Sequence, residues 1–366
     1  MDEPAPVEKE QFQSRFEAML RDVREGIVQD YAFFNVPSDK VPWLDTGIDV
    51  RAGDQLTSFA VGGTELKGTP IRFGPYFQLW FRVGADNEIF RGTRDTHTWK
   101  AERPGRLYLA SYFPGEWSTK TGALGTSADV YNLVAGSLSV LLVRWRTNPL
   151  DGLKNLASQG DVGNLIATEI DRLTSPVLPP EGWNYLWFVG PAEIYRPCKV
   201  PGRESAICCY THNDVGLLQK PVSLTLKPNT RLRWSWKMDV LPSTVREDTL
   251  PTHDYMSVAV EFDNGQDITY YWSAELPVGT AYRCPIPTWN ARETHVVIRS
   301  GSQGLGEWVN EERDVYQDYA SAIGGPMPGN IVRIWLIAVS FFQQKEGKCQ
   351  YSDIALVTNG NTIPVH

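Results

Sequence analysis

The hydrophobic positions of the chain change their period along the sequence, and each change predicts a different kind of element. In residues 8–31 the apolar side chains recur every three or four positions, at Phe12, Phe16, Met19, Leu20, Val23 and Ile27. This spacing places them on one face of an amphipathic helix. We expect that helix to lie across a sheet or a domain junction.

A strand pattern follows between residues 42 and 147, in short runs such as FQLWFRVG and SLSVLLVRW. Gly- and Pro-rich turns such as VGGTELKGTP separate these runs. Short strands with such turns between them are typical of an antiparallel β-sandwich or barrel. A helical period returns in GDVGNLIATEIDRL and is followed by the proline-rich TSPVLPPEGW, which together predict a connector.

The rest of the chain returns to strand patterns, among them RLRWSWKM, YMSVAVEF, ITYYWSA and IVRIWLIAVSFF. A length of 366 residues favours two domains. We therefore predict an all-β protein with two antiparallel, jelly-roll-like β-sandwich domains. The predicted order is an N-terminal amphipathic helix in 1–40, a first sandwich in 41–147, a helical connector in 148–182 and a jelly roll in 183–366.

Charge and hydropathy exclude several classes of partner. The formal net charge is -8, and the 35 Lys and Arg residues are scattered, so the basic patch of a nucleic-acid-binding protein is missing. No apolar run reaches the roughly 20 residues that span a bilayer, and the start MDEPAPVEKEQF is acidic, unlike a signal peptide. We expect a cytoplasmic protein, with a mature secreted form as the alternative.

Cysteine usage and the familiar motifs give little sign of a cofactor. The five cysteines, with Cys208 next to Cys209, do not form a disulfide framework, and we expect buried reduced thiols. The alternative is a metal site of Cys208, Cys209 and His212, although this spacing lacks the paired ligands of zinc sites. No phosphate-binding loop, dinucleotide fingerprint, nucleophile elbow or H-E-x-x-H motif is present. We expect no metal and no organic cofactor.

Residues 42–147 resemble the galactose-binding lectins of the PA-I type. The stretches that carry the resemblance are VPWLDTGIDVRAGDQLTSFAVG, FQLWFRVG and GRLYLASYF with YNLVAGSLSVLLV. The resemblance implies a sandwich fold and a calcium-dependent sugar site. In this chain ASYF replaces the Asn-Asp pair of that family, and only Asp129 and Asn132 match its second element. Because calcium takes six or more oxygen ligands, the motif for the ion is incomplete.

Residues 183–358 resemble a bacterial family of β-sandwich proteins known only as a domain of unknown function. The stretches that carry this second resemblance are LRWSWKMDVLP, HDYMSVAVEFDNG, ITYYWS, HVVIRSG, GEWVNEERDVYQDY and YSDIAL. The resemblance implies a fold but no activity.

Alternation along the strands of the second half separates a core face from a polar face. The polar set that could share one surface contains Glu261, His295 and Tyr271 as candidate catalytic groups. The candidate ligand-binding groups are Arg233, Lys237, Tyr255, Trp272 and Asp254. A carboxylate, a His and a Tyr within reach of one another can act as general base and acid, with Arg or Lys stabilising negative charge. The alternative is a solvated sheet face with ordinary cross-strand ion pairs.

The pair His253 and Asp254 precedes a strand and is more simply a turn or cap than a catalytic dyad. We therefore predict a cofactor-independent enzyme that uses acid/base side chains for elimination, isomerisation or hydrolysis. Its substrate would be a carbohydrate-like or other small organic molecule, bound on the second domain or between the domains. The alternatives are a non-catalytic, lectin-like carbohydrate-binding protein, in which the 42 aromatic residues (13 Trp, 15 Tyr and 14 Phe) provide rings that stack on sugars, and a structural protein. The oligomeric state is open.

Overall fold

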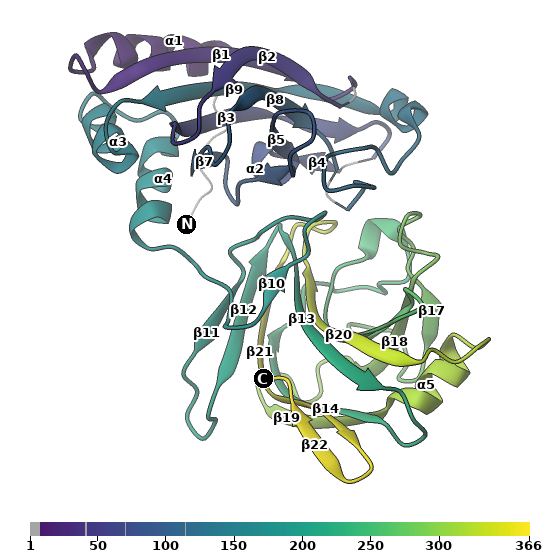
Figure 1. Cartoon of the computed structure of the whole chain (residues 1–366). Coiled ribbons are helices and arrows are strands. Elements are labelled where there is room, and N and C mark those ends of the chain that lie inside the picture. Colours follow the sequence, from purple (N-terminus) through teal and green to yellow (C-terminus); the bar gives the residue numbers. More distant parts are fainter. Residues whose placement is uncertain (1–7, 41, 70, 114) are drawn as a thin grey trace. The chain divides into compact units, whose positions relative to one another are not determined.

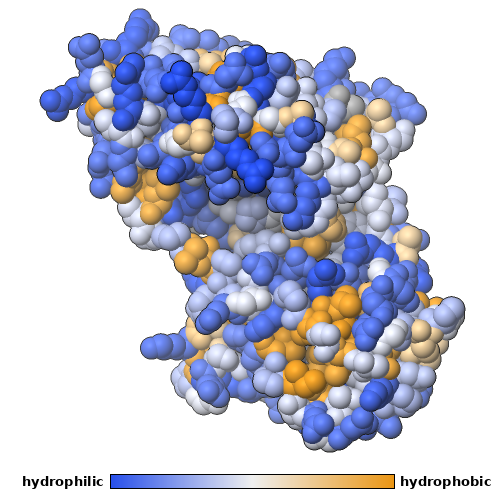
Figure 2. All heavy atoms as spheres, viewed as in Figure 1, coloured by the Kyte–Doolittle hydropathy of each residue, from blue (hydrophilic) through white to orange (hydrophobic). Residues whose placement is uncertain are grey.

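The computed structural model describes residues 8–40, 42–69, 71–113 and 115–366 (Figure 1). The chain forms two compact units. The first contains the residues up to 176 together with 187–191, and the second contains 177–186 together with 192–366. In the view of Figure 2 most of the first unit over α1 (Lys9–Asp22) is hydrophilic, whereas hydrophobic side chains gather over β13 (Val215–Thr225) and β20 (Asn330–Val339) of the second unit.

The first unit is a sandwich of two antiparallel sheets, confirming this part of the predicted fold class. Its larger sheet has the order β1-β9-β3-β4, with β7 on β3; the strands are β1 (Val28–Pro37), β3 (Gln55–Leu66), β4 (Arg72–Phe73), β7 (Thr96–Lys100) and β9 (Val134–Trp145). The smaller sheet has the order β2-β8-β5-β6, formed by β2 (Leu44–Val50), β5 (Leu79–Val83), β6 (Phe90–Arg91) and β8 (Gly105–Ser111). Alternate apolar residues such as Leu56, Phe81, Leu109 and Val140 fill the space between the sheets.

Three helices cover the other face of the larger sheet: α1, α3 (Pro149–Ala157) and α4 (Leu165–Thr174). The short α2 (Pro75–Gln78) and the 3-10 helix η1 (Ala128–Leu133) complete the unit. Phe16 of α1 packs on Phe59 of β3 at a ring distance of 4.9 Å. The amphipathic helix is thus confirmed, but it ends at Asp22 because the chain turns at Gly26, whose φ of 87° favours glycine, and continues as β1.

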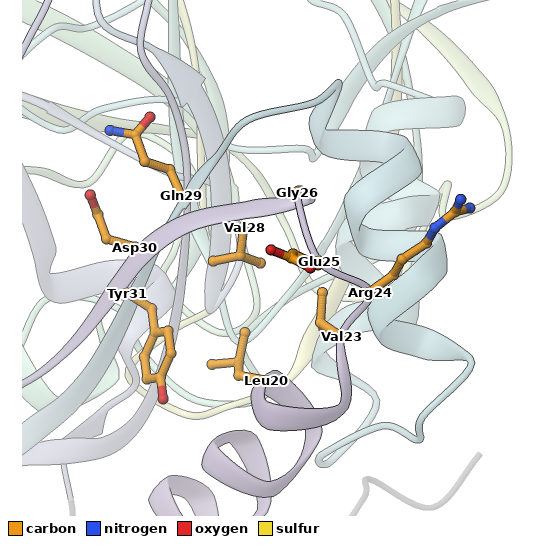
Figure 3. Close-up of a pocket in the computed structure, with 9 residues that line it drawn as sticks. All are labelled: Leu20, Val23, Arg24, Glu25, Gly26, Val28, Gln29, Asp30 and Tyr31. Carbon is orange, nitrogen blue, oxygen red and sulfur yellow. The ribbon is translucent and has the colours of Figure 1, made fainter.

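The turn between α1 and β1 leaves an open pocket of about 440 Å³ in the first unit (Figure 3). Its polar lining comes mainly from Arg24, Glu25, Gln29 and Asp30, with one aromatic side chain, Tyr31. None of the residues that the sequence singled out as candidate site residues lies in this pocket.

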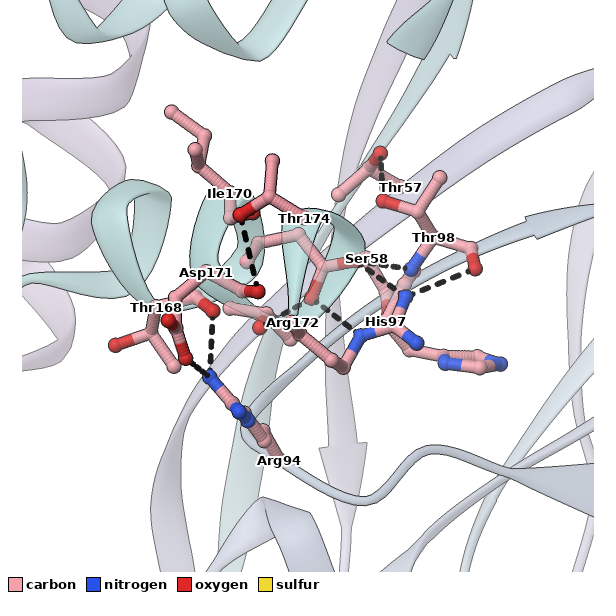
Figure 4. Close-up of polar contacts among 12 residues, drawn as sticks. Thr57, Ser58, Arg94, His97, Thr98, Thr168, Ile170, Asp171, Arg172 and Thr174 are labelled. Atoms are coloured by element: carbon pink, nitrogen blue, oxygen red, sulfur yellow. Dashed lines mark hydrogen bonds and ion pairs between the residues drawn. The ribbon is translucent and has the colours of Figure 1, made fainter. Parts of the chain in front are cut away.

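Helix α4 is held to β7 by a buried carboxylate. Glu169, whose side chain is fully buried, accepts hydrogen bonds from Thr96 Oγ1 at 2.7 Å and from the backbone N–H of Thr98 at 2.6 Å. Its ion-pair partner Arg172 also donates to the carbonyl of Thr98, and Arg94 donates to Thr168 and Asp171 nearby (Figure 4). The segment after β9 is therefore fastened to the first unit by specific polar contacts.

Replacing Glu169 by Gln should lower the free energy of unfolding of the first unit by about 3 kcal/mol, because Arg172 would keep a poorly compensated charge. The matched control is Asp171→Asn, which removes an exposed ion pair with Arg94 and should cost less than about 1 kcal/mol. Urea unfolding followed by circular dichroism measures both. Equal losses in the two variants would contradict this assignment.

The second unit is a larger sandwich of two sheets. The first has the order β10-β13-β20-β15-β16-β18-β17, adding β10 (Asn184–Tyr185), β15 (Tyr255–Phe262), β16 (Asp267–Ser273), β17 (Ala281–Arg283) and β18 (Glu293–Ser300). The second has the order β11-β12-β21-β14-β19, with β22 on β21; its strands are β11 (Tyr195–Cys198), β12 (Ala206–His212), β14 (Arg231–Val240), β19 (Trp308–Asp314), β21 (Glu346–Thr358) and β22 (Asn361–Pro364). The helix α5 (Val315–Ala322) and the 3-10 helix η2 (Leu250–Thr252) lie in the connections.

Most strand pairs of the second unit are antiparallel, as predicted, and the core between the sheets is rich in aromatic residues such as Trp234, Trp236 and Tyr270. One pair differs, because β16 and β18 run parallel. Parallel neighbours need a connection that returns the chain to the same end of the sheet. The segment from residue 274 to 292 makes this return, with β17 paired on β18. None of the helices in the described part of the chain has the length and apolar character of a membrane-spanning helix.

The expectation that all cysteines are reduced is wrong for two of them. Cys198 and Cys208 form a disulfide between β11 and β12. Successive residues of a strand point to opposite faces, so the neighbouring Cys209 points into the core and stays a free thiol, as do the buried Cys284 and Cys349. The disulfide also removes Cys208 from the metal site considered with Cys209 and His212.

Alkylation of the unfolded, unreduced chain should therefore label three of the five cysteines, and all five should react after reduction. Mass spectrometry of the intact protein counts the labels. Labelling of all five without a reductant would contradict the Cys198–Cys208 bond.

Candidate functional site

The seven-stranded sheet of the second unit has a polar face that points away from the sandwich core but is nevertheless buried. Tyr255, Ser257, Thr269, Tyr271 and His295 alternate with the core residues of their strands, and each has at most 3% of its surface exposed. Two segments contact this face, residues 241–254 through His253 and residues 274–292 through Trp289, and we call them the covering segments. Glu247 of the first accepts hydrogen bonds from Ser273 and Ala274, both at 2.6 Å.

Four potential metal ligands converge between the covering segments and β18. His253 ends the first covering segment, Cys284 lies in the second, and Glu293 and His295 lie on β18. Each of these residues offers one ligand atom, and the four ligand atoms all lie within 4.8 Å of one another. All four side chains are buried. Glu293 and His295 share a face because they are two positions apart on a strand.

The hydrogen bonds of the cluster fix the orientation of one imidazole and leave the other without a partner. His253 Nδ1 lies 2.6 Å from the carbonyl oxygen of Glu247 and must donate to it, so Nε2 presents its lone pair toward Cys284 Sγ at 3.4 Å. His295 Nε2 lies 3.5 Å from Glu293 Oε1, and neither of its ring nitrogens has a hydrogen-bond partner among the described residues. Glu293 Oε1 accepts from Tyr255 at 3.0 Å and from Thr269 at 3.3 Å.

Burial controls the ionisation of this cluster. It lowers the pKa of His253 to about 3, which keeps the ring neutral, and raises the pKa of the Cys284 thiol. Burial opposes ionisation of Glu293, but the neighbouring imidazole of His295 outweighs it and lowers the pKa of this carboxyl. Burial and the neighbouring charge of Glu293 raise the pKa of Asp267.

Three of the predicted residues meet around this cluster. The ring of Tyr255 lies 4.8 Å from His295, and that of Tyr271 lies 5.7 Å from it. Tyr282, which sequence analysis did not single out, stacks on His295 with the two ring centroids 5.1 Å apart. Its hydroxyl oxygen lies 2.9 Å from the hydroxyl oxygen of Tyr271. The aromatic and imidazole rings thus form one buried polar interior.

Glu261 lies on the same face of the sheet, but outside the cluster. Both of its carboxylate oxygens lie 2.9 Å from Arg333 Nη1, and Arg292 lies 3.8 Å away. The guanidinium of Arg292 lies over the rings of Trp289 and Trp335 at 5.2 and 5.4 Å. Unlike the buried cluster, this end of the face reaches the surface, because the side chain of Arg333 is 41% exposed.

Acidic side chains form a row across the three strands of this face. Glu261 on β15 is the cross-strand neighbour of Asp267 on β16, and Asp267 is the neighbour of Glu293 on β18. Arg292 lies between the first two, with its Nε 4.0 Å from Asp267 Oδ2. Asp267 is thus the acidic residue that lies directly beside Glu261.

The expectation that Arg233 and Lys237 share a surface with Glu261 is wrong. Both lie on β14, which belongs to the opposite sheet, where Arg233 pairs with Glu312 and Lys237 lies 3.2 Å from Asp239. The expectation failed because alternation sets the face of each strand but does not say which sheet the strand joins.

Two further candidates have local structural partners. Trp272 points into the sandwich core, and its indole N–H donates to the carbonyl of Gly301 at 2.9 Å. Asp254 accepts hydrogen bonds from the backbone N–H groups of Phe342 and Gln343. Asp254 thus anchors a loop, in line with the predicted turn or cap role of the His253 and Asp254 pair, whereas His253 is part of the cluster.

Sequence reasoning missed Cys284 and Glu293 as site residues. Cys284 is a lone cysteine within a turn-rich segment, and nothing local marks it as a ligand. Glu293 and His295 do carry a weak signal, because two ligand-type residues alternate on one face of a strand. Asp129 and Asn132, which match one element of the calcium motif of the lectins, are both exposed on η1.

Several solved structures share a local resemblance with parts of the chain. The N-terminal domain of EclA, a PllA-like lectin, is 18% identical over 33% of this chain and 99% of its own length, with a TM-score of 0.26. The xyloglucanase domain of NopAA from Sinorhizobium fredii is 7% identical over 49% of this chain and 94% of its own, with a TM-score of 0.29. The family 30 carbohydrate-binding module of a Clostridium thermocellum cellulase is 10% identical over 46% of this chain and 84% of its own length, with a TM-score of 0.26. At such low scores, nothing about the ligand of this chain follows from them.

No curated protein matches the chain in sequence. A family match covers part of the second half, as the resemblance of that half to a family without assigned activity predicted. Residues 181–355 match a family described as a protein of unknown function, DUF3047.

Proposed function

We propose that the second unit binds a small, carbohydrate-like ligand that carries a carboxylate, and that Glu261 acts on it as a general base. The ligand site would be the arginine rim, by which we mean Arg292 and Arg333 at the exposed end of the polar face. The observation that carries the proposal is the contact of Glu261 with both Arg292 and Arg333 beside the rings of Trp289 and Trp335.

The side chains of this rim match the needs of such a ligand. Guanidinium groups bind carboxylates through paired hydrogen bonds. Trp289 and Trp335 provide apolar surface beside the charges, as expected of a site for a sugar ring.

The reaction that this set supports is elimination next to a carboxylate. A guanidinium that neutralises the ligand carboxylate makes the hydrogen on the neighbouring carbon more acidic. Glu261 would take that proton, the C–O bond on the next carbon would break, and the leaving oxygen would take a proton from water. The product contains a carbon-carbon double bond conjugated with the carboxylate, and no co-reactant is consumed.

Non-catalytic binding is the second candidate function, and one observation favours it. Both oxygens of Glu261 already lie at hydrogen-bond distance from Arg333, so the carboxylate is held in an ion pair. A lectin-like protein would use the same arginine rim without turnover.

For the compartment, the support comes from the cysteine chemistry rather than from the ligand site. A disulfide such as Cys198–Cys208 persists in oxidising compartments and is rare in the cytosol. This supports the secreted alternative over the cytoplasmic one, and extracellular glycans are then accessible ligands.

Replacing Glu261 by Gln should reduce turnover of uronate oligosaccharides about 100-fold or more while changing their affinity only a few-fold. Replacing Arg292 by Gln should weaken binding about 10-fold, because a charge-assisted contact is lost. Ultraviolet absorbance of the conjugated product measures turnover, and calorimetry measures binding.

The matched control is Glu307→Gln, which removes an exposed carboxylate elsewhere in the second unit and should leave both quantities unchanged. Binding of uronates without any turnover would overturn the role of Glu261 and leave the lectin-like candidate. No preference for uronates over neutral oligosaccharides would overturn the proposed ligand class.

A further inference from the structure

The cluster of His253, Cys284, Glu293 and His295 has a geometry that ordinary core packing does not explain. Four metal-ligand side chains from three separate segments place their ligand atoms within 4.8 Å of one another. Burying polar groups together is costly unless each finds a partner. His295 is fully buried, and both of its ring nitrogens lack a hydrogen-bond partner among the described residues.

Two of the ligand-to-ligand distances match opposite edges of a tetrahedral site. Zinc bonds of about 2.0 Å to nitrogen or oxygen and about 2.3 Å to sulfur give ligand-to-ligand separations of about 3.3–3.6 Å at tetrahedral angles. Cys284 Sγ and His253 Nε2 are 3.4 Å apart, and His295 Nε2 and Glu293 Oε1 are 3.5 Å apart. Two opposite edges of the tetrahedron are therefore already at the required length.

The groups around the cluster orient its ligands. The hydrogen bond from His253 Nδ1 to the carbonyl of Glu247 directs the lone pair of Nε2 into the cluster. Tyr255 and Thr269 hold the carboxylate of Glu293. Metal-bound imidazoles and carboxylates are commonly fixed by partners of this kind, which set both tautomer and direction.

We propose that His253, Cys284, Glu293 and His295 bind one divalent transition-metal ion of the zinc type, which fastens both covering segments to β18. One sulfur and two imidazole ligands favour such an ion over calcium or magnesium, which prefer oxygen. Four protein ligands and full burial match a structural site, because catalytic zinc sites keep one position for water or substrate.

Binding requires the Cys284 thiol to lose its proton, so uptake of the ion is accompanied by proton release. The ion would give one ring nitrogen of His295 a partner and join the covering segments to β18. This inference is independent of the proposed function, because it needs neither Glu261 nor a ligand at the arginine rim.

The test uses the full chain, freed of metal with a chelator and then titrated with zinc alone. Calorimetry should give one tight site per chain with proton release, and zinc should raise the midpoint of thermal unfolding. Cys284→Ser and His295→Gln should each weaken zinc binding more than about 100-fold. The matched controls are Cys349→Ser, another buried thiol, and His212→Gln, an exposed imidazole, and both should bind zinc like the unmodified chain.

A second measurement needs no variant and therefore holds even if the variants fail to fold. Cobalt(II) added to the metal-free chain should give intense visible bands of a tetrahedral ion and a near-ultraviolet band from a single thiolate. Absence of stoichiometric zinc, a six-coordinate cobalt spectrum, or unchanged binding in folded Cys284→Ser would overturn the proposal.

Discussion

Burial of a polar sheet face beneath two covering segments is the constraint on which the rest of the second unit depends. The outward side of β15, β16 and β18 carries Tyr255, Thr269, Tyr271 and His295, all of which lie away from water. Such groups must find partners inside the protein, because an unsatisfied buried polar atom costs free energy comparable to a lost hydrogen bond. The covering segments provide some of those partners, because Tyr282 pairs with Tyr271 and Glu247 accepts a hydrogen bond from Ser273. The second covering segment also returns the chain to the same end of the sheet, as the parallel pair of β16 and β18 requires.

This arrangement links the proposed metal site to the proposed ligand site. The second covering segment contains Cys284 and leads to Arg292, so an ion held at Cys284 would also restrain the loop that carries part of the arginine rim. The row of Glu261, Asp267 and Glu293 joins the two ends of the face across three neighbouring strands. One end is sealed and rich in metal ligands, and the other is charged and open to solvent, so the two ends suit different tasks.

The periodicity of the hydrophobic residues was sufficient to predict the sandwich class, the N-terminal helix and the core residues of individual strands. In YMSVAVEF the residues assigned to the core, such as Val258 and Val260, do lie there. Alternation was not sufficient to pair strands, which is why Arg233 and Lys237 were grouped with Glu261 although β14 lies in the other sheet. Strand order depends on contacts between distant segments, and a local pattern does not contain them.

The candidate site could be predicted only where it lies on strands. His295, Tyr255 and Tyr271 were found by their position on the polar face, whereas Cys284 and His253 come from irregular segments that tertiary contacts bring together. The disulfide was missed for a similar reason, since the pairing of Cys198 with Cys208 depends on the β11–β12 hairpin. Long-range geometry, rather than residue type, thus separates what was found from what was missed.

Anomalous X-ray diffraction at the zinc absorption edge, from crystals of the full chain loaded with zinc, tests the central claim most directly. The account predicts one strong peak in the second unit, about 2.0–2.3 Å from His253 Nε2, Cys284 Sγ, His295 Nε2 and one carboxylate oxygen of Glu293. A peak at other residues only, or no peak among these four side chains, would contradict it.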